Sequence, residues 1–185
     1  MRVIAGKARG TKLISPEGLE TRPTTDRIKE SLFNIIAPDL YDCLFLDLFS
    51  GSGGIGIEAL SRGAKEAVFV DMSKDAFKCI KTNVEKTRFT QEAVIFNSSM
   101  ELALNQLGKE NKKFHIIFMD PPYNKDVIND TIELIVKYGL LVPKGYIIIE
   151  SDSLYTITHS KELILYKEKK YGGTTMSFLK GTEDR

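Results

Sequence analysis

The chain has 185 residues, of which 42% are hydrophobic and 28% charged, and its formal net charge is +1. These values exclude a disordered or fibrous protein and predict a soluble globular protein of ordinary domain size. No apolar run is long enough to span a membrane, and the start lacks a signal-peptide core, so we expect a cytoplasmic monomer with no membrane partner. Cys43 and Cys79 lack metal-type spacing, which predicts reduced, packed thiols and no metal site.

A basic stretch and one helix make up the first forty residues. Apolar residues recur at helical spacing from about Thr24 onwards and stop before Pro38, which predicts a helix between these two residues. We therefore divide the chain into an N-terminal basic extension with its helix at 1–40 and a main domain at 41–185.

Strands and helices alternate through the main domain. Strands are expected at 44–49, 66–70, 93–96, 114–119 and 145–150, and helices at 53–62, 73–86, 100–107 and 126–138. Near-continuous apolar strands between amphipathic helices indicate a parallel sheet covered on both faces. Two more strands at 163–169 and 175–179, joined across Gly172-Gly173, predict an antiparallel hairpin. The expected fold is α/β and Rossmann-like: a doubly wound, mostly parallel seven-stranded sheet that ends in an antiparallel hairpin. A small N-terminal β-hairpin, from short extended segments at 2–5 and 11–14, precedes it.

Basic residues gather near both ends of the chain. The first twelve residues carry four cations and no acid, and near the other end Lys161, Lys167, Lys169 and Lys170 outnumber Glu162 and Glu168. A basic face built from both ends would suit a polyanion. An ordinary solvated surface explains the same residues equally well.

A glycine-rich turn joins the first strand of the main domain to its helix. It contains the pattern G-x-G-x-x-G as Gly51, Gly53 and Gly56, whose backbone can turn tightly and approach a ligand closely. Asp71 ends the next strand, where a carboxylate can accept hydrogen bonds from two ribose hydroxyls. A structural turn with a capping Asp is the simpler interpretation. Dinucleotides and S-adenosylmethionine both use this geometry, and the turn alone does not decide between them.

The sequence Asp120-Pro121-Pro122-Tyr123 follows an apolar strand. Two prolines cannot continue a strand inside a sheet, so they predict a stiff loop at the carboxyl end of the strand. Ligands bind at that end in open α/β sheets. The simpler interpretation is a rigid turn in which Asp120 caps and Tyr123 packs.

The chemistry of this loop suits an amine nucleophile better than hydride transfer. An exocyclic amine on a base is a poor nucleophile because its lone pair is delocalised into the ring. The Asp120 carboxylate and the Pro121 carbonyl can accept its two hydrogens and favour a pyramidal nitrogen, while Tyr123 stacks on the flipped-out base. Catalysis would then rest on alignment and local electrostatics. Whether Asp120 or water takes the released proton stays open.

Several segments together resemble a known family. The chain resembles class I S-adenosylmethionine-dependent amino-methyltransferases, whose catalytic loop is D/N-P-P-Y/F, and more closely the bacterial RsmD-type enzymes that methylate guanine N2 in 16S rRNA. Segments 2–10, 22–34 and 46–64 carry the resemblance, and Asp120–Tyr123 agrees in position. The resemblance implies S-adenosylmethionine as cofactor and small-subunit rRNA, or a ribosomal assembly intermediate, as partner.

The resemblance also assigns roles to residues. It implies cofactor binding by Asp47, Phe49, Ser50, Gly51, Ser52, Gly53, Asp71, Met72, Asn97 and Ser98, catalysis by Asp120, Pro121, Pro122 and Tyr123, and RNA binding by Arg2, Lys7, Arg9, Arg22, Thr24 and Arg27. Many such enzymes place an Asp after the third strand, where this chain has Asn97-Ser98-Ser99. A neutral side chain there can still hydrogen-bond adenine.

Three alternatives remain beside this interpretation. A nucleotide-dependent oxidoreductase would use the glycine turn but leaves the Asp120 loop unexplained. A methyltransferase acting on another amine, such as adenine N6 or a protein side chain, would fit the loop equally well. A non-catalytic RNA-binding assembly factor would keep the fold but predicts a damaged cofactor site. His115 lies in an apolar strand and His159 in a polar loop, which predicts one packed and one solvated histidine rather than catalysis.

Overall fold

Seven strands form one sheet in the order β3-β2-β1-β4-β5-β7-β6 in the computed structural model, which describes residues 1–16, 26–122, 125–152 and 161–182. The strands are β1 Leu44–Leu48, β2 Glu66–Val70, β3 Ala93–Phe96, β4 Phe114–Met119, β5 Leu141–Asp152, β6 Leu163–Tyr171 and β7 Thr174–Gly181. The helices are α1 Asp26–Ile36, α2 Gly54–Ser61, α3 Lys74–Thr87, α4 Met100–Lys109 and α5 Lys125–Lys137, with a short 3₁₀ turn at Ala37–Asp39.

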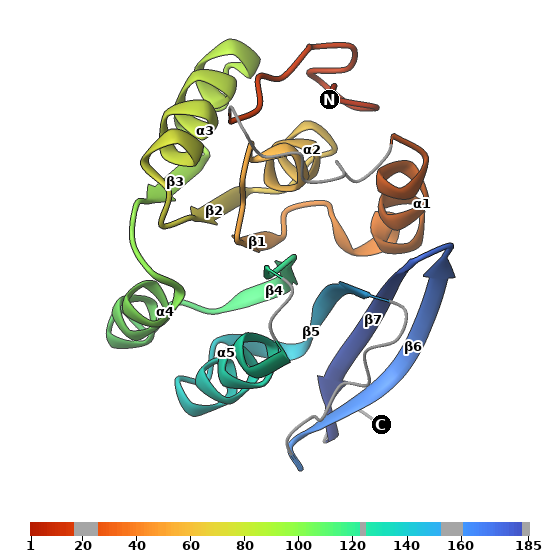
Figure 1. Cartoon of the computed structure of the whole chain (residues 1–185), viewed down its shortest axis with the longest axis vertical. Coiled ribbons are helices and arrows are strands. Elements are labelled where there is room, and N and C mark those ends of the chain that lie inside the picture. Colours follow the sequence, from red (N-terminus) through yellow and green to blue (C-terminus); the bar gives the residue numbers. More distant parts are fainter. Residues whose placement is uncertain (17–25, 123–124, 153–160, 183–185) are drawn as a thin grey trace.

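Helices cover both faces of this sheet, as Figure 1 shows. The N-terminal segment and helices α1, α2 and α3 pack on one face, around buried residues such as Phe33, Phe69 and Phe118. Helices α4 and α5 pack on the other face, around Leu46, Ile117 and Ile147. Alternate residues along each strand supply the two cores, because successive side chains point to opposite faces. The expected doubly wound architecture is confirmed.

The strand directions indicate at which edge of the sheet a ligand would bind. Strands β1 to β5 pair in parallel, whereas β7 pairs antiparallel with both β5 and β6. The chain order reverses between β1 and β4, which lie side by side in the middle of the sheet. Such a switch point opens a crevice outside the carboxyl ends of the strands. The glycine turn after β1, Asp71 after β2 and Asp120 after β4 all lie at this edge.

Strands β2, β3 and β4 have the predicted bounds, but the predicted end of helix α4 is wrong. The helix continues through Gly108 to Lys109, so this glycine does not terminate it. A Cβ on Gly108 would lie 2.8 Å from the Cβ of Tyr138, at the end of α5. The glycine therefore serves the close packing of α4 on α5.

Strand β5 also begins earlier than predicted, at Leu141, with a register shift against β4.

The N-terminal segment forms a smaller hairpin than expected. Arg2 and Lys12 make an isolated antiparallel bridge, and the Val3 N–H donates to the Thr11 carbonyl at 3.0 Å. Val3 and Leu13 are buried in the core beside α1 and α2. The segment is therefore packed against the main sheet and its helices, while the predicted helix start at Thr24 lies outside the described residues.

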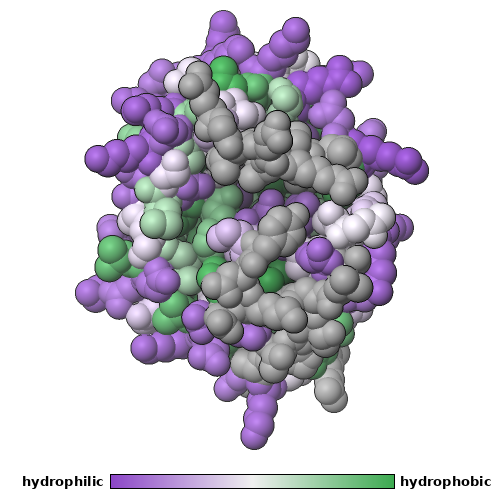
Figure 2. All heavy atoms as spheres, viewed as in Figure 1, coloured by the Kyte–Doolittle hydropathy of each residue, from purple (hydrophilic) through white to green (hydrophobic). Residues whose placement is uncertain are grey.

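The surface in the view of Figure 1 is not uniform. Figure 2 shows hydrophilic residues around the outline and apolar residues gathered between α3 and α4. Within the described ranges, no helix combines the length and apolarity that crossing a membrane requires.

Candidate active site

The glycine turn after β1 adopts a backbone that few residues tolerate. Gly51 and Gly53 have φ values of +55° and +74°, and Gly53 occupies the N-cap of helix α2. Phe49 takes φ +60° although it carries a side chain, a strained conformation typical of functional sites. Ser50 donates to the Asp47 carbonyl at 2.6 Å and accepts the Val70 N–H at 3.0 Å. Ser50 therefore ties the turn to the end of β2.

All three glycines of the motif donate their N–H groups within the protein. Gly51 donates to Asp71 Oδ2 at 2.9 Å and Gly56 to Asp47 Oδ2 at 2.9 Å, while Gly53 donates to the Ser50 carbonyl. A pyrophosphate would need such amides free, because anions bind at helix N-termini through unpaired N–H groups. These three N–H groups are therefore not available to the phosphates of a dinucleotide.

Three carboxyl groups interact electrostatically at this edge. Asp47 is 1% exposed, and burial raises its pKa well above the usual range, with the charges of Asp71 and Asp120 acting in the same direction and the Gly56 N–H opposing them. Like charges disfavour ionisation, and a bound cation would relieve that repulsion. The edge therefore favours a positively charged ligand.

Asp120 stands at the switch point beside the glycine turn. It follows Met119, which pairs with Leu48 across β4 and β1, so Asp120 lies next to Phe49. Pro121 is buried and Pro122 exposed, whereas Tyr123 lies outside the described residues. Although Asp120 still reaches solvent, the protein around its carboxyl desolvates it enough to raise its pKa to about 6.

This pKa makes stability depend on pH. The folded protein keeps the Asp120 proton up to about pH 6, while the unfolded chain releases it near the ordinary value of 3.8. The native state therefore binds more protons between these values, and the free energy of unfolding falls as pH rises through this window. We expect the wild type to lose stability relative to Asp120→Asn between about pH 4 and 6, measured by urea denaturation. A relative gain over that window would contradict the shift.

The predicted cofactor residues beyond β2 lie together. Asp71 Oδ1 accepts the Ser73 N–H at 2.9 Å, and Asn97 donates to the carbonyls of Asp71 and Met72 at 3.1 and 3.2 Å. Asn97 therefore holds the turn after β2, and only its amide oxygen remains for a ligand. Met72 is 76% exposed, an unusual position for a large apolar residue and one that a planar ring would cover.

A hollow of about 590 Å³ continues from Asn97 and Ser98 to helix α4. Its apolar lining includes Phe96 at the end of β3 and Leu102, which is 68% exposed. Sequence patterns did not single out Leu102, because an apolar residue in an amphipathic helix is ordinarily assigned to the core. Its exposure on the hollow marks it as a further candidate for contact with an apolar ligand group.

Four of the predicted RNA-binding residues lie within the described part of the chain. Arg2 forms an exposed pair with Asp26 at 2.9 Å, and Lys7, Arg9 and Arg27 are exposed. Arg22 and Thr24 lie outside the described residues. The described cations of this group therefore lie on the N-terminal segment and on α1.

A buried cluster of charged residues, which sequence patterns did not reveal, holds the N-terminal segment on helix α2. Glu58 of α2 accepts the N–H groups of Ile4 and Ala5 at 2.8 and 3.0 Å. It also pairs with Lys29 of α1 at 3.1 Å, where both side chains are 0% exposed, and with Arg62 at 2.9 Å, whose side chain is 13% exposed. A lone acid in the apolar run of 54–61 was the available signal.

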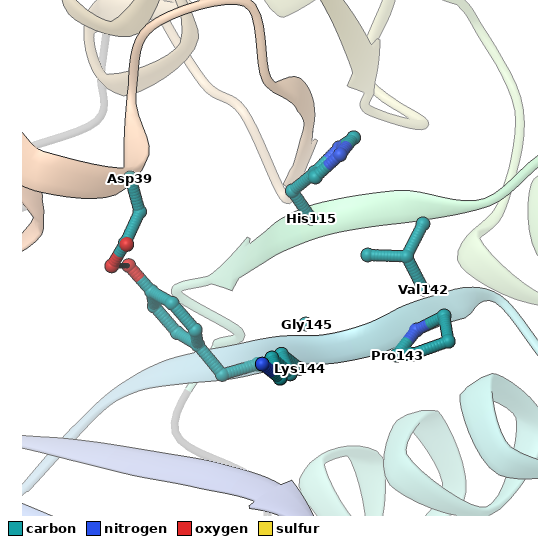
Figure 3. A pocket seen from close by; sticks show the side chains of 7 residues that line it. Asp39, His115, Val142, Pro143, Lys144 and Gly145 are labelled. Atoms are coloured by element: carbon teal, nitrogen blue, oxygen red, sulfur yellow. Dashed lines mark hydrogen bonds between the residues drawn. The ribbon is translucent and has the colours of Figure 1, made fainter. Parts of the chain in front are cut away.

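A second hollow, of about 200 Å³, lies at the opposite edge of the sheet. Figure 3 shows Asp39, His115 and Lys144 around it. The prediction that His115 is packed is wrong: it is exposed beside the register shift between β4 and β5, and its Nδ1 accepts the Leu44 N–H at 3.1 Å. This edge carries the amino ends of the strands, so the hollow is separate from the carboxylate cluster.

Comparisons with known proteins find relatives along nearly the whole chain. The family model described as "Conserved hypothetical protein 95" matches residues 1–180. The chain is 38% identical to "Putative rRNA methyltransferase YlbH" of Bacillus subtilis, over 97% of this chain and 98% of the relative. It is 35% identical to "Ribosomal RNA small subunit methyltransferase D" of Escherichia coli, over 82% of this chain and 75% of the relative. The solved structure "Putative methyltransferase yhhF from Escherichia coli" has a TM-score of 0.87 at 35% identity, covering 98% of this chain and 97% of that one.

Proposed function

The chain belongs to the family described as "Conserved hypothetical protein 95", and we propose that it transfers a methyl group from S-adenosylmethionine to the exocyclic N2 amine of a guanine in 16S rRNA. One relative is named an rRNA methyltransferase and another a ribosomal RNA small subunit methyltransferase. These names support the reaction class and the substrate. The assignment of the guanine N2 amine as methyl acceptor is based on the Asp120-Pro121-Pro122 loop and on the resemblance of the N-terminal motifs.

The carboxylate cluster carries the choice of cofactor. S-adenosylmethionine has a sulfonium and an ammonium group and no phosphate. The three glycine N–H groups already have acceptors in the protein, and the charges of Asp71 and Asp120 both act against ionisation of Asp47. A cationic ligand lowers this repulsion, whereas a pyrophosphate would add to it.

The described residues can be assigned to parts of the cofactor. Asp47 and the turn of 50–53 would hold the amino-acid end, and Asp71 would hold the ribose. A carboxylate has about four lone-pair sites, and Asp71 uses two for Gly51 and Ser73, which leaves capacity for two hydroxyls. Met72, Asn97 and Ser98 would contact the adenine. Once bound, this cofactor supplies a methyl group activated by the sulfonium.

Asp120 and the Pro121 carbonyl prepare the amine. Their oxygens accept its two hydrogens, which fixes the plane of the base and directs the nitrogen lone pair towards the methyl carbon. The methylated nitrogen then releases one proton. A carboxyl whose pKa is about 6 is ionised near neutral pH. Its pKa is also close enough to neutral pH for the carboxylate to accept a proton. Asp120 therefore suits both orientation and proton acceptance.

The modified nucleoside tests the function. In a strain that lacks this protein, mass spectrometry of nucleosides from 16S rRNA should show the loss of one N2-methylguanosine. The wild-type gene should restore it and the Asp120→Ala gene should not. Loss of a different methylated nucleoside would assign another amine, and an unchanged nucleoside profile would contradict rRNA methylation.

Calorimetry supplies the control for the cofactor. The purified protein should bind S-adenosylmethionine and show no heat of binding with NAD. Binding of NAD alone would place the chain among nucleotide-dependent oxidoreductases.

A further inference from the structure

The C-terminal hairpin carries a basic and aromatic surface on the face of the sheet that α1 covers. Tyr166, Lys167 and Lys169 of β6 and Lys180 of β7 form it, and we call these four residues the hairpin patch. All three β6 residues are exposed. Glu168 lies between two of the lysines in sequence but pairs with Ser177, on the opposite face. The patch therefore presents positive charge without this acid.

A bulge brings aromatic and basic groups to the same face. The register of β6 against β7 shifts between Leu165 and Lys167, so Tyr166 and Lys167 both lie against Phe178. The Tyr166 and Phe178 rings are 6.1 Å apart, and the Lys167 ammonium lies 5.7 Å from the Phe178 ring centre. Bulges commonly redirect a side chain next to a functional site. The Lys180 ammonium lies 5.4 Å from the Tyr166 ring centre.

The strand register places this patch relative to Asp120. Met119 of β4 pairs with Ile149 of β5, and Glu150, the next residue of β5, pairs with Met176 of β7, which pairs with Lys169. Asp120 and Lys169 therefore stand at the ends of one row across the sheet. Three strand spacings separate them, roughly 14 Å. This is the reach of a short stretch of nucleic acid beyond the reacting base.

The hairpin patch lies on the other side of β4 from the glycine turn. The strand order puts β1 and β2 on one side of β4, and β5, β7 and β6 on the other. Tyr171, at the end of β6, shares a 2.6 Å hydrogen bond with Ser31 of α1, so the hairpin tip is fixed beside the helix that carries Arg27. An RNA that reaches Asp120 would thus meet the hairpin patch on the β5 side of β4, with Arg27 on the helix next to the hairpin tip.

We propose that the hairpin patch is a second RNA-contacting surface, which binds the phosphate backbone through Lys167, Lys169 and Lys180 and offers Tyr166 for stacking on a base. The proposal rests on the proposed rRNA substrate. Lysines bind phosphates as point charges, and aromatic side chains stack on bases regardless of sequence. The patch would therefore add affinity and orientation, while Asp120 and the cofactor perform the chemistry.

Neutralising two of these lysines tests the proposal. Lys167→Gln with Lys169→Gln should weaken binding to unmethylated 16S rRNA on the order of tenfold near physiological salt, and should reduce the slope of log K against log salt by about 1.4 to 1.8. The KM for the RNA should rise similarly at an unchanged kcat, and S-adenosylmethionine affinity should stay the same. The double arginine variant should bind as the wild type does.

The matched control is Lys65→Gln with Lys113→Gln. These exposed lysines directly precede β2 and β4, at the edge opposite Asp120, and their loss should leave binding unchanged. Equal effects from both pairs of substitutions would mean that the patch lysines act only through the overall charge of the protein, which would contradict a specific contact. Normal RNA binding with self-association on size-exclusion chromatography would mean that the lysines only protect an open sheet edge. If the wild type binds no rRNA, the proposed function fails as well. If the wild type binds rRNA and the Lys167/Lys169 variant binds it equally well, only the proposal about the hairpin patch fails.

Discussion

Asp120→Ala should lower the rate of methyl transfer by about 10²–10⁴-fold while S-adenosylmethionine affinity changes by only a small factor. A positioned proton acceptor contributes about this much to catalysis, as does a hydrogen-bond acceptor in a pre-organised site. Asp120 lies at the switch point beside Phe49, whereas the glycine turn is held by Asp47 and Asp71. The turn should therefore survive the substitution. Single-turnover kinetics and calorimetry measure the two quantities separately.

Asp120→Asn separates two roles of the carboxylate. Its amide oxygen still accepts an amine hydrogen, but the side chain cannot take a proton near neutral pH. If orientation dominates, Asp120→Asn should stay within about tenfold of the wild type, as the D/N choice in the related loops suggests. If Asp120 accepts the proton, the Asn variant should be nearly as slow as the Ala variant. Near-normal turnover of Asp120→Ala would remove the residue from the catalytic site.

Local patterns predicted most of the helices and strands, and they predicted which residues lie at the carboxyl ends of the strands. Apolar runs and helical periodicity were sufficient for β2, β3 and β4, because a strand buried on both faces has a nearly continuous apolar sequence. The turn at Gly53 was predictable for a similar reason, since its conformation depends on residues close in sequence. Asp71 and Asp120 followed from their positions at strand ends.

Features that depend on distant contacts were not predictable. A glycine such as Gly108 is typical of a helix C-terminus. Here, however, it allows close packing against Tyr138, which lies thirty residues further along the chain. The row that joins Asp120 to Lys169 depends on the strand order of the sheet, which an alternating pattern does not specify. Glu58 appeared only as one acid in an apolar helix. Its partners Ile4, Ala5 and Lys29 lie on two segments that are distant in the sequence.

Glu58→Ala should lower the free energy of unfolding by about 3–5 kcal/mol, the usual effect of removing one partner from a buried ion pair. The substitution leaves the Lys29 ammonium, 0% exposed, without its carboxylate, and leaves the N–H groups of Ile4 and Ala5 without their acceptor. A domain is stable by only about 5–15 kcal/mol, so this loss would be a large fraction. Urea denaturation measures it.

Glu58→Ala combined with Lys29→Met should recover part of this stability, since the fully buried Lys29 charge is then gone. The recovery should be incomplete because the two backbone N–H groups stay unpaired and the largely buried Arg62 guanidinium also loses its carboxylate. Lys78→Ala is the control, since its 3.2 Å pair with Asp75 is exposed and should contribute little.

The pH dependence identifies the cause of the Glu58 effect. Burial already lowers the pKa of Lys29 from 10.5, and Glu58 opposes that shift, so Glu58→Ala should lower this pKa further. The unfolded chain then keeps the Lys29 proton to higher pH than the folded variant does, and stability rises with pH until about 10.5. The defect of Glu58→Ala should therefore shrink as the pH approaches that value. A defect that is independent of pH would instead assign the loss to the unpaired Ile4 and Ala5 amides.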